Sequence, residues 1–188
     1  MIHKPNFFVF TGGPGVGKTA LIRHLQAMGE TVVEETHRAV IAEQAAAGSR
    51  AVPWDDFAAY CELCVRRDIG KFDALVEAMG PEATGRVFFD RSILDSFDSR
   101  WAAPPDLEAA ARDRRYNRRV FVFPPWREIY ETDAERRQDW AEARATFPRI
   151  LEVVARFGYE PVTVPPGTLA ERAAFVLAQA AQAPSGPA

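Results

Sequence analysis

A cluster of glycines between an apolar run and a Lys-Thr pair is the feature that most constrains this chain. The apolar run 7–10 leads into Gly12-Gly13-Pro14-Gly15-Val16-Gly17-Lys18-Thr19, which fits the pattern G-x-x-x-x-G-K-[ST]. Glycines let successive backbone N–H groups curl around an anion without a clash from Cβ. A helix that begins near Gly17 aims its free amides and its positive dipole end at the same point. The sequence therefore predicts a loop that cradles phosphate groups.

The residues of this loop are the predicted nucleotide site. We expect contacts to the phosphates of a nucleoside triphosphate from Gly12, Gly13, Pro14, Gly15, Val16, Gly17, Lys18, Thr19 and Ala20. Lys18 can reach the β- and γ-phosphates, which also makes it a candidate catalytic residue, and the Thr19 hydroxyl can bind Mg²⁺. The alternative is a glycine-rich turn that only joins a strand to a helix. The full pattern in a strand–helix context favours the phosphate loop.

Strand-like and helix-like segments alternate along the chain. Apolar β-type runs occur at residues 7–10, 31–33, 86–89, 120–123 and 161–164, and helical stretches at 18–28, 36–47, 55–79, 92–101, 106–116, 134–157 and 169–181. Such alternation is typical of a mainly parallel sheet covered by helices on both faces, the α/β class. With 188 residues, 47% of them hydrophobic, the chain suits one α/β domain. We expect that domain over residues 1–181, and a disordered tail over 182–188.

Composition disfavours two classes of partner. A net charge of −3 argues against broad nucleic-acid binding. We interpret the basic run 112–119 as a solvated face, because it precedes the fourth strand and its end should lie at the sheet edge opposite the phosphates. No apolar run of 18 residues exists and the N-terminus resembles a first strand rather than a signal peptide, so we expect no membrane segment and a cytoplasmic location.

The two cysteines, Cys61 and Cys64, form a C-x-x-C pair. Such a pair can carry redox chemistry or half of a zinc site, but zinc would need two more ligands and the three histidines are scattered. In a helix, residues three apart share a face. We therefore favour two small apolar residues on a buried helix face.

Acidic residues follow two of the predicted strands. Glu34 and Glu35 follow the second strand, and Asp90 and Arg91 follow the third. Ligands in open α/β sheets bind beyond the carboxyl ends of the strands. Asp90 there has the form of a second magnesium ligand, although it can equally cap the next helix. Glu35 is either a functional carboxylate that orients or deprotonates a hydroxyl or a solvated residue, while Arg91 can neutralise charge on a transferred group.

Four stretches taken together carry a family resemblance. GGPGVGKT, VVEETHR, VFFDRSILDS and PPWREIYETDAERRQDW, in this order, resemble small P-loop ATPases usually filed as AAA-type domains. These are similar in layout to nucleoside and nucleotide kinases, including the ribosylnicotinamide kinase domain. The resemblance spans nearly the whole chain and implies a three-layer fold with a five-stranded parallel sheet in the order 2-3-1-4-5. It also implies Glu35 as the base and Asp90 with Arg91 as the magnesium and substrate residues. The residues themselves leave the base open among Glu34, Glu35 and Asp90.

The same resemblance implies an arginine-containing lid at about residues 126–145. Arg136 and Arg137 lie in it, and neighbouring helical residues point about 100° apart, so one of the two should face the phosphates. The alternative is a charged helix with acidic–arginine pairs. The resemblance further makes the loop 162–168 an adenine-side wall.

The predicted function is that of an Mg²⁺-dependent kinase that transfers the ATP γ-phosphate to a small nucleoside-like or other hydroxyl acceptor. The alternative is an ATPase that acts as a nucleotide-dependent switch on a protein partner. A GTPase is disfavoured because neither Asn6 nor Asn117 begins an N-K-x-D motif. Trp54, Phe57 and Tyr60 either cover an acceptor pocket or belong to the core. The acceptor and the oligomeric state are not indicated.

Overall fold

A parallel five-stranded sheet forms the centre of the molecule. The computed structural model describes residues 1–80, 83–98, 100–129 and 140–183. The sheet order is β3-β4-β2-β6-β7, with every neighbouring pair parallel. The strands are β2 (Phe7–Gly12), β3 (Thr31–Val33), β4 (Val87–Asp90), β6 (Arg119–Phe123) and β7 (Glu160–Thr163). Counted along the chain within this sheet, the order is 2-3-1-4-5, which confirms the predicted fold.

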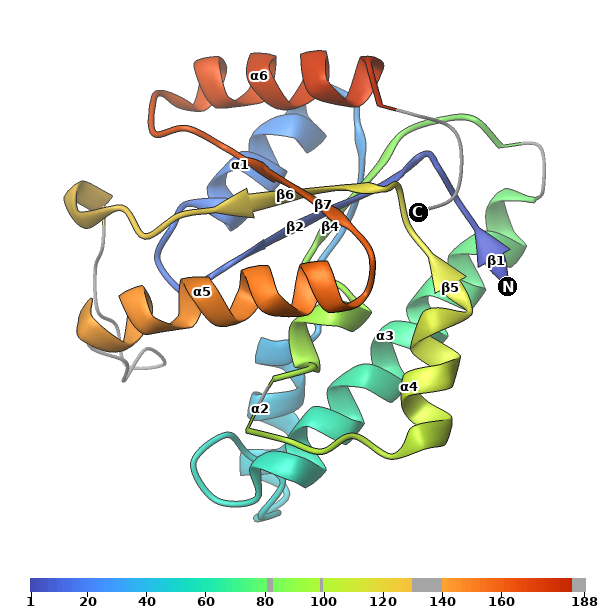
Figure 1. Ribbon diagram of the computed structural model, residues 1–188, viewed down its shortest axis with the longest axis vertical. Coiled ribbons are helices and arrows are strands. Elements are labelled where there is room, and N and C mark those ends of the chain that lie inside the picture. The colour runs from blue at the N-terminus through green and yellow to red at the C-terminus, as the bar shows by residue number, and fades with distance from the viewer. Residues whose placement is uncertain (81–82, 99, 130–139, 184–188) are drawn as a thin grey trace.

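Helices cover both faces of the sheet (Figure 1). One layer holds α1 (Lys18–Ala27) and α6 (Leu169–Ala181). The other face is covered by α3 (Phe57–Met79), α4 (Pro105–Arg112) and α5 (Trp140–Arg156), with α2 (His37–Ala46) packed against α3.

Alternate side chains of β2 supply the two cores. Phe7 and Val9 pack into the core under α3 and α5, whereas Phe8 and Phe10 pack into the core under α1 and α6. Successive strand residues point to opposite faces, so a strand buried on both sides reads as a continuous apolar run. This central strand therefore holds the loop that follows it on a rigid base.

Two predicted helices are wrong in extent. Residues 92–101 form only the 3₁₀ turn η1 (Ile93–Ser96), where the Ser92 hydroxyl and the Asp95 carboxylate cap each other's backbone amides. Short polar side chains that bond the local backbone compete with a continuing helix. The predicted helix 106–116 ends at Arg112, because β5 (Arg114–Arg115) pairs with β1 (Ile2–His3) in a separate two-stranded sheet.

Some predicted segments lie outside the described residues. These are residues 134–139 of the predicted helix 134–157, and residues 184–188 of the predicted tail. Of the lid, the structure describes residues 126–129, which include the 3₁₀ turn η2 (Arg127–Ile129), and residues 140–145 at the start of α5.

The basic run 112–119 is a solvated face only in part: Arg112 and Arg118 are exposed, whereas three other arginines of the run are not. Arg115 is buried and donates to the Phe157 carbonyl at 2.8 Å, while Arg114 forms an ion pair with Asp73 at 2.6 Å. Arg119 donates to the Gln179 carbonyl at 3.1 Å. These charges fasten helices to the sheet.

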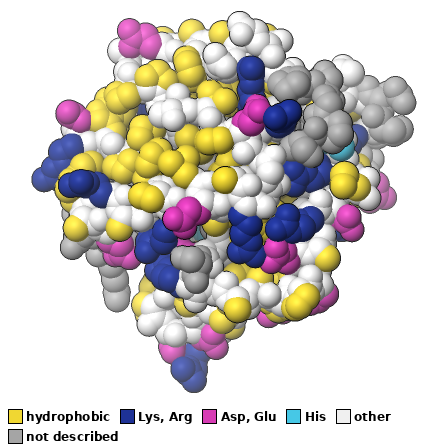
Figure 2. Space-filling model, viewed as in Figure 1, with side chains coloured by type: hydrophobic (Ala, Val, Ile, Leu, Met, Phe, Trp, Pro, Cys, Tyr) yellow, Lys and Arg dark blue, Asp and Glu magenta, His cyan; other side chains and the backbone are white. Residues whose placement is uncertain are grey.

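The face drawn in Figure 2 carries Lys and Arg side chains beside Asp and Glu side chains rather than a field of one sign. Within the part of the chain that the structure describes, no helix is both long and apolar enough to cross a membrane.

Candidate active site

The glycine cluster forms the loop between β2 and α1. Gly12, Gly15 and Gly17 all have positive φ, at 153°, 71° and 78°. A Cβ on Gly12 would lie 2.7 Å from the Phe123 carbonyl oxygen, so only glycine fits there. The N-cap of α1 is Gly17, which has no side chain to cap the first amides of the helix, so these amides can meet an anion. The loop therefore fits a bound phosphate group.

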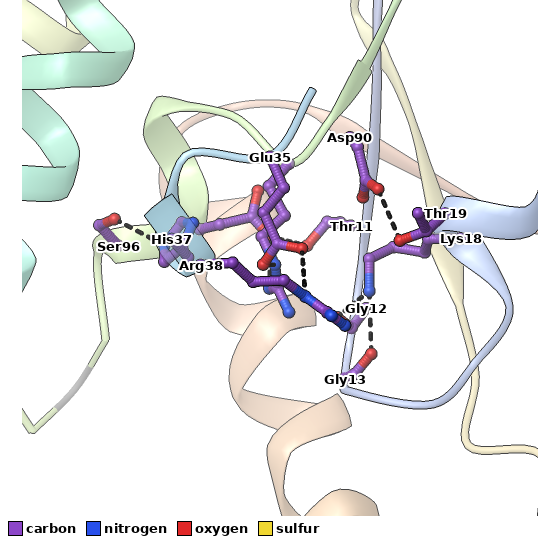
Figure 3. Close-up of polar contacts among 12 residues, drawn as sticks. Thr11, Gly12, Gly13, Lys18, Thr19, Glu35, His37, Arg38, Asp90 and Ser96 are labelled. Carbon is purple, nitrogen blue, oxygen red and sulfur yellow. Dashed lines mark hydrogen bonds and ion pairs between the residues drawn. The ribbon is translucent and has the colours of Figure 1, made fainter. Parts of the chain in front are cut away.

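Lys18 is folded back onto this loop. Its Nζ donates to the carbonyl oxygens of Gly12 at 2.8 Å and Gly13 at 2.9 Å (Figure 3). Burial, followed by the nearby Arg91 guanidinium, lowers the pKa of Lys18 to about 8. A buried cation whose hydrogen bonds to the described residues go to two neutral carbonyls has much to gain from a phosphate anion.

Thr19 and Asp90 lie together at the base of the loop. The Thr19 hydroxyl donates to Asp90 Oδ2 at 2.9 Å (Figure 3). Among the described residues, no group hydrogen-bonds the buried Asp90 Oδ1. A hydroxyl and a carboxylate with a spare oxygen are suitable ligands for Mg²⁺, which completes its shell with phosphate oxygens and water. These residues therefore fit a magnesium ion.

Arg91 links Glu35, which follows β3, to Asp95 in η1. Its Nε donates to Glu35 Oε1 at 2.8 Å and its Nη1 to Asp95 Oδ1 at 3.3 Å. The Arg91 backbone is left-handed, with φ of 69°, and its amide donates to the Phe10 carbonyl at 2.9 Å. Asp95 also accepts a hydrogen bond from the Thr11 hydroxyl at 2.6 Å. A strained backbone that its surroundings hold in place is typical of functional sites.

Glu35 is the one of the three candidate bases that lines the cavity described below. Glu34 is exposed, and Asp90 is buried behind Thr19. Burial raises the pKa of Glu35, but the opposing charges, led by Arg91 and Lys18, hold it down at about 2. Arg38 adds an ion pair with Glu35 at 3.5 Å. Glu35 is therefore ionised at neutral pH and is a weak base.

His37 anchors the segment that carries Glu35. The ring is buried, and Nε2 lies 3.0 Å from the Ser96 hydroxyl of η1 (Figure 3). Burial, followed by Arg91, lowers the pKa of His37 to about 3, so the ring is neutral at physiological pH. The contact ties the start of α2 to η1, the turn after β4.

A cavity of about 650 Å³ extends from the phosphate loop to a second compartment. The residues that line this second compartment include Arg38, Trp54, Phe57, Tyr60, Asp98, Arg100 and Arg149. Asp98 is ion-paired with Arg100 at 2.8 Å and lies 4.0 Å from Arg149. The volume, with aromatic walls and charged side chains that could fix the orientation of a ligand, is typical of small-molecule sites. Trp54, Phe57 and Tyr60 all line the cavity, and Tyr60 also belongs to the core.

The structure does not place two groups of predicted site residues at this cavity. Arg136 and Arg137 lie outside the described residues. The loop 162–168 does not line this cavity. Sequence reasoning missed Arg100 and Arg149, which come from segments with no recognisable motif.

The C-x-x-C pair is buried on α3 as two free thiols. Burial raises the pKa of Cys61 and of Cys64 to about 12. Among the described residues, no three His, Cys, Asp or Glu side chains form a metal cluster. The interpretation as small apolar residues agrees with this geometry.

The chain matches a known protein family over most of its length. Residues 7–172 match a protein family described as the AAA domain. A search of curated proteins found no significant match. A NadR protein in complex with NR is 23% identical with a TM-score of 0.59, over 85% of this chain and 45% of that one. This chain thus spans less than half of the NadR chain.

A second solved structure has a similar fold over its whole length. Shikimate kinase from Acinetobacter baumannii, in complex with shikimate, is 16% identical with a TM-score of 0.50. The match covers 95% of this chain and 93% of that one. At these identities the two structures show a shared fold.

Proposed function

The chain belongs to the AAA-domain family, and on that premise we propose that it is a kinase that transfers the γ-phosphate of Mg-ATP to a hydroxyl of a small acceptor. The observation that carries the proposal is one cavity that joins the phosphate loop to an aromatic and charged compartment, with Glu35 lining it. The two similar structures hold small molecules, NR and shikimate, which supports a small acceptor. The sequence resemblance to the ribosylnicotinamide kinase domain favours a nucleoside-like one.

Nucleotide binding uses the loop, Lys18 and the residues that suit magnesium. The amides that follow Gly12 surround the phosphates, and Lys18 exchanges its two carbonyl partners for phosphate oxygens. Thr19 and Asp90 would hold Mg²⁺, which offsets negative charge on the β- and γ-phosphates. The missing guanine motif and the family resemblance favour ATP over GTP.

Transfer joins the acceptor oxygen to the γ-phosphorus while the bond between that phosphorus and the β,γ-bridging oxygen breaks. ADP leaves with the electron pair of the broken bond. Glu35 orients the acceptor hydroxyl and takes its proton, and a weak base suffices because phosphoryl transfer has a loose transition state. Arg91 stabilises charge on the phosphoryl group. When the Arg91 guanidinium contacts the phosphoryl group, its ion pair with Glu35 weakens, and the Glu35 carboxylate becomes more basic. Arg136 or Arg137 is proposed to assist from the lid.

A thermal-shift screen of nucleosides, vitamins and sugars with a non-hydrolysable ATP analogue identifies the acceptor. Glu35→Gln then tests the role of the carboxylate, with exposed Glu34→Gln as the matched control. We expect Glu35→Gln to keep ATP affinity and to reduce transfer by about 10²–10⁴-fold, the usual contribution of general base catalysis. Equal rates in the two variants would exclude Glu35 as the base. If no acceptor is phosphorylated and a protein partner accelerates hydrolysis, the switch replaces the kinase.

A further inference from the structure

Arg172 is a buried cation next to the phosphate loop. It lies in the first turn of α6 and is 3% exposed. Its guanidinium lies over the rings of Phe123 at 5.0 Å and Trp126 at 5.3 Å. Within the described part of the chain, no carboxylate pairs with it, and its buried Nε has no hydrogen-bond partner. Burial lowers the pKa of Arg172.

The guanidinium lies directly behind the phosphate loop. Nη2 donates to the Val16 carbonyl oxygen at 3.0 Å. A Cβ built on Gly17 would be 2.6 Å from Nη1, so the loop backbone and the guanidinium are in direct contact. The Val16 carbonyl and the Gly17 N–H belong to one trans peptide and point in opposite directions. A hydrogen bond that fixes the carbonyl behind the loop therefore fixes the N–H toward its concave side.

A buried cation that pairs with no carboxylate of the described residues is unfavourable in the empty protein. Phosphates bound in the loop would offset that charge from the other side of the peptide. A hydrogen bond from a guanidinium to a carbonyl also polarises the peptide and strengthens its N–H as a donor. Both effects favour the nucleotide-bound state over the empty one.

From these contacts we propose that Arg172 is a positioning residue of the phosphate site, which orients the Val16–Gly17 peptide and supplies the buried charge that a polyphosphate neutralises. This inference rests on the proposed nucleotide binding. The competing interpretation is that Arg172 only fastens α6 to the sheet. In that case its loss lowers stability and affects every ligand of the loop alike.

Arg119 offers the matched control. It also joins the sheet to α6, through the Gln179 carbonyl, and lies in β6 at the end of the sheet away from the loop. Arg119→Gln should lower the melting temperature and leave nucleotide affinity unchanged. Arg172→Gln should instead weaken Mg-ATP binding by roughly 10–100-fold, the range for a hydrogen bond to a charged group. Arg172→Lys keeps the positive charge and should weaken Mg-ATP binding less than Arg172→Gln does.

The test is calorimetric titration of wild type and variants with Mg-ATP, Mg-ADP and AMP, together with melting curves of the unliganded proteins. We expect the loss in Arg172→Gln to be largest for ATP and ADP, whose β-phosphate reaches the loop, and smallest for AMP. An equal loss for all three ligands, or an unchanged ATP affinity in folded Arg172→Gln, overturns the proposal. If Arg172→Gln does not fold, the same comparison with Arg172→Lys decides.

A further arm separates this inference from the proposed function. Wild type is titrated with Mg-tripolyphosphate and orthophosphate. If wild type binds tripolyphosphate but not ATP, the ATP proposal is refuted. The role of Arg172 is then tested by whether Arg172→Gln loses more affinity for tripolyphosphate than for orthophosphate. Binding of neither ATP nor tripolyphosphate overturns both.

Discussion

The Lys18 amine should change its protonation when a nucleotide binds. Burial and Arg91 lower its pKa from the ordinary 10.5 to about 8 in the empty protein, so the amine is half neutral near pH 8. Phosphates favour the charged form and return the pKa toward its ordinary value. Nucleotide binding should therefore take up a proton at alkaline pH.

The size of the uptake follows from the two pKa values. If the bound-state pKa is near 10.5, binding takes up roughly 0.1 proton at pH 7 and roughly 0.9 proton at pH 9. Above pH 8 the affinity for Mg-ATP should fall, by an amount that approaches roughly tenfold per pH unit. The second pKa of a phosphate is about 6, so the ligand itself adds little in this range.

Titration calorimetry in two buffers of different ionisation enthalpy measures the uptake directly. Lys18→Arg is the control, because a guanidinium stays charged across this range and should show no uptake. An uptake in wild type that is the same at pH 7 and pH 9, or the same as in Lys18→Arg, would show that Lys18 is fully charged in the empty protein. The pKa of Lys18 would then not be lowered by its burial.

Two further predictions concern the magnesium ligand and the cysteines. Asp90→Asn should reduce the gain in ATP affinity on adding Mg²⁺ by about tenfold or more, measured by titration with and without the metal; an unchanged gain would exclude Asp90 as a ligand. Burial raises the pKa values of Cys61 and Cys64 to about 12. Both thiols should therefore react with a thiol reagent at pH 8 far more slowly in the native protein than in urea. Fast labelling of the native protein would contradict their burial.

The sequence predicts best what depends on neighbouring residues. The glycine-rich loop combines its backbone requirement and its chemistry in one short stretch, so the sequence alone predicts Lys18 and Thr19 as site residues. Asp90 and Glu35 follow because parallel strands end at the same edge of the sheet, and β3 does lie beside β4.

Residues that reach the site through tertiary packing could not be predicted. Arg172 contacts Val16 across 156 positions of sequence, and Arg100 and Arg149 meet at Asp98 from different elements. Local competition also misled the prediction at η1, where Ser92 and Asp95 end a helix that composition alone favours.

Single-turnover transfer of labelled γ-phosphate tests the central claim most directly. Enzyme and Mg-ATP are mixed with and without an acceptor from the screen, and the label is partitioned between acceptor and water. A kinase built as described should hydrolyse ATP slowly alone and pass most of the label to the acceptor, with the transfer greatly reduced in Glu35→Gln. Label released only to water, at a rate that no acceptor in a broad panel changes, would contradict the claim that this cavity is a phosphotransfer site.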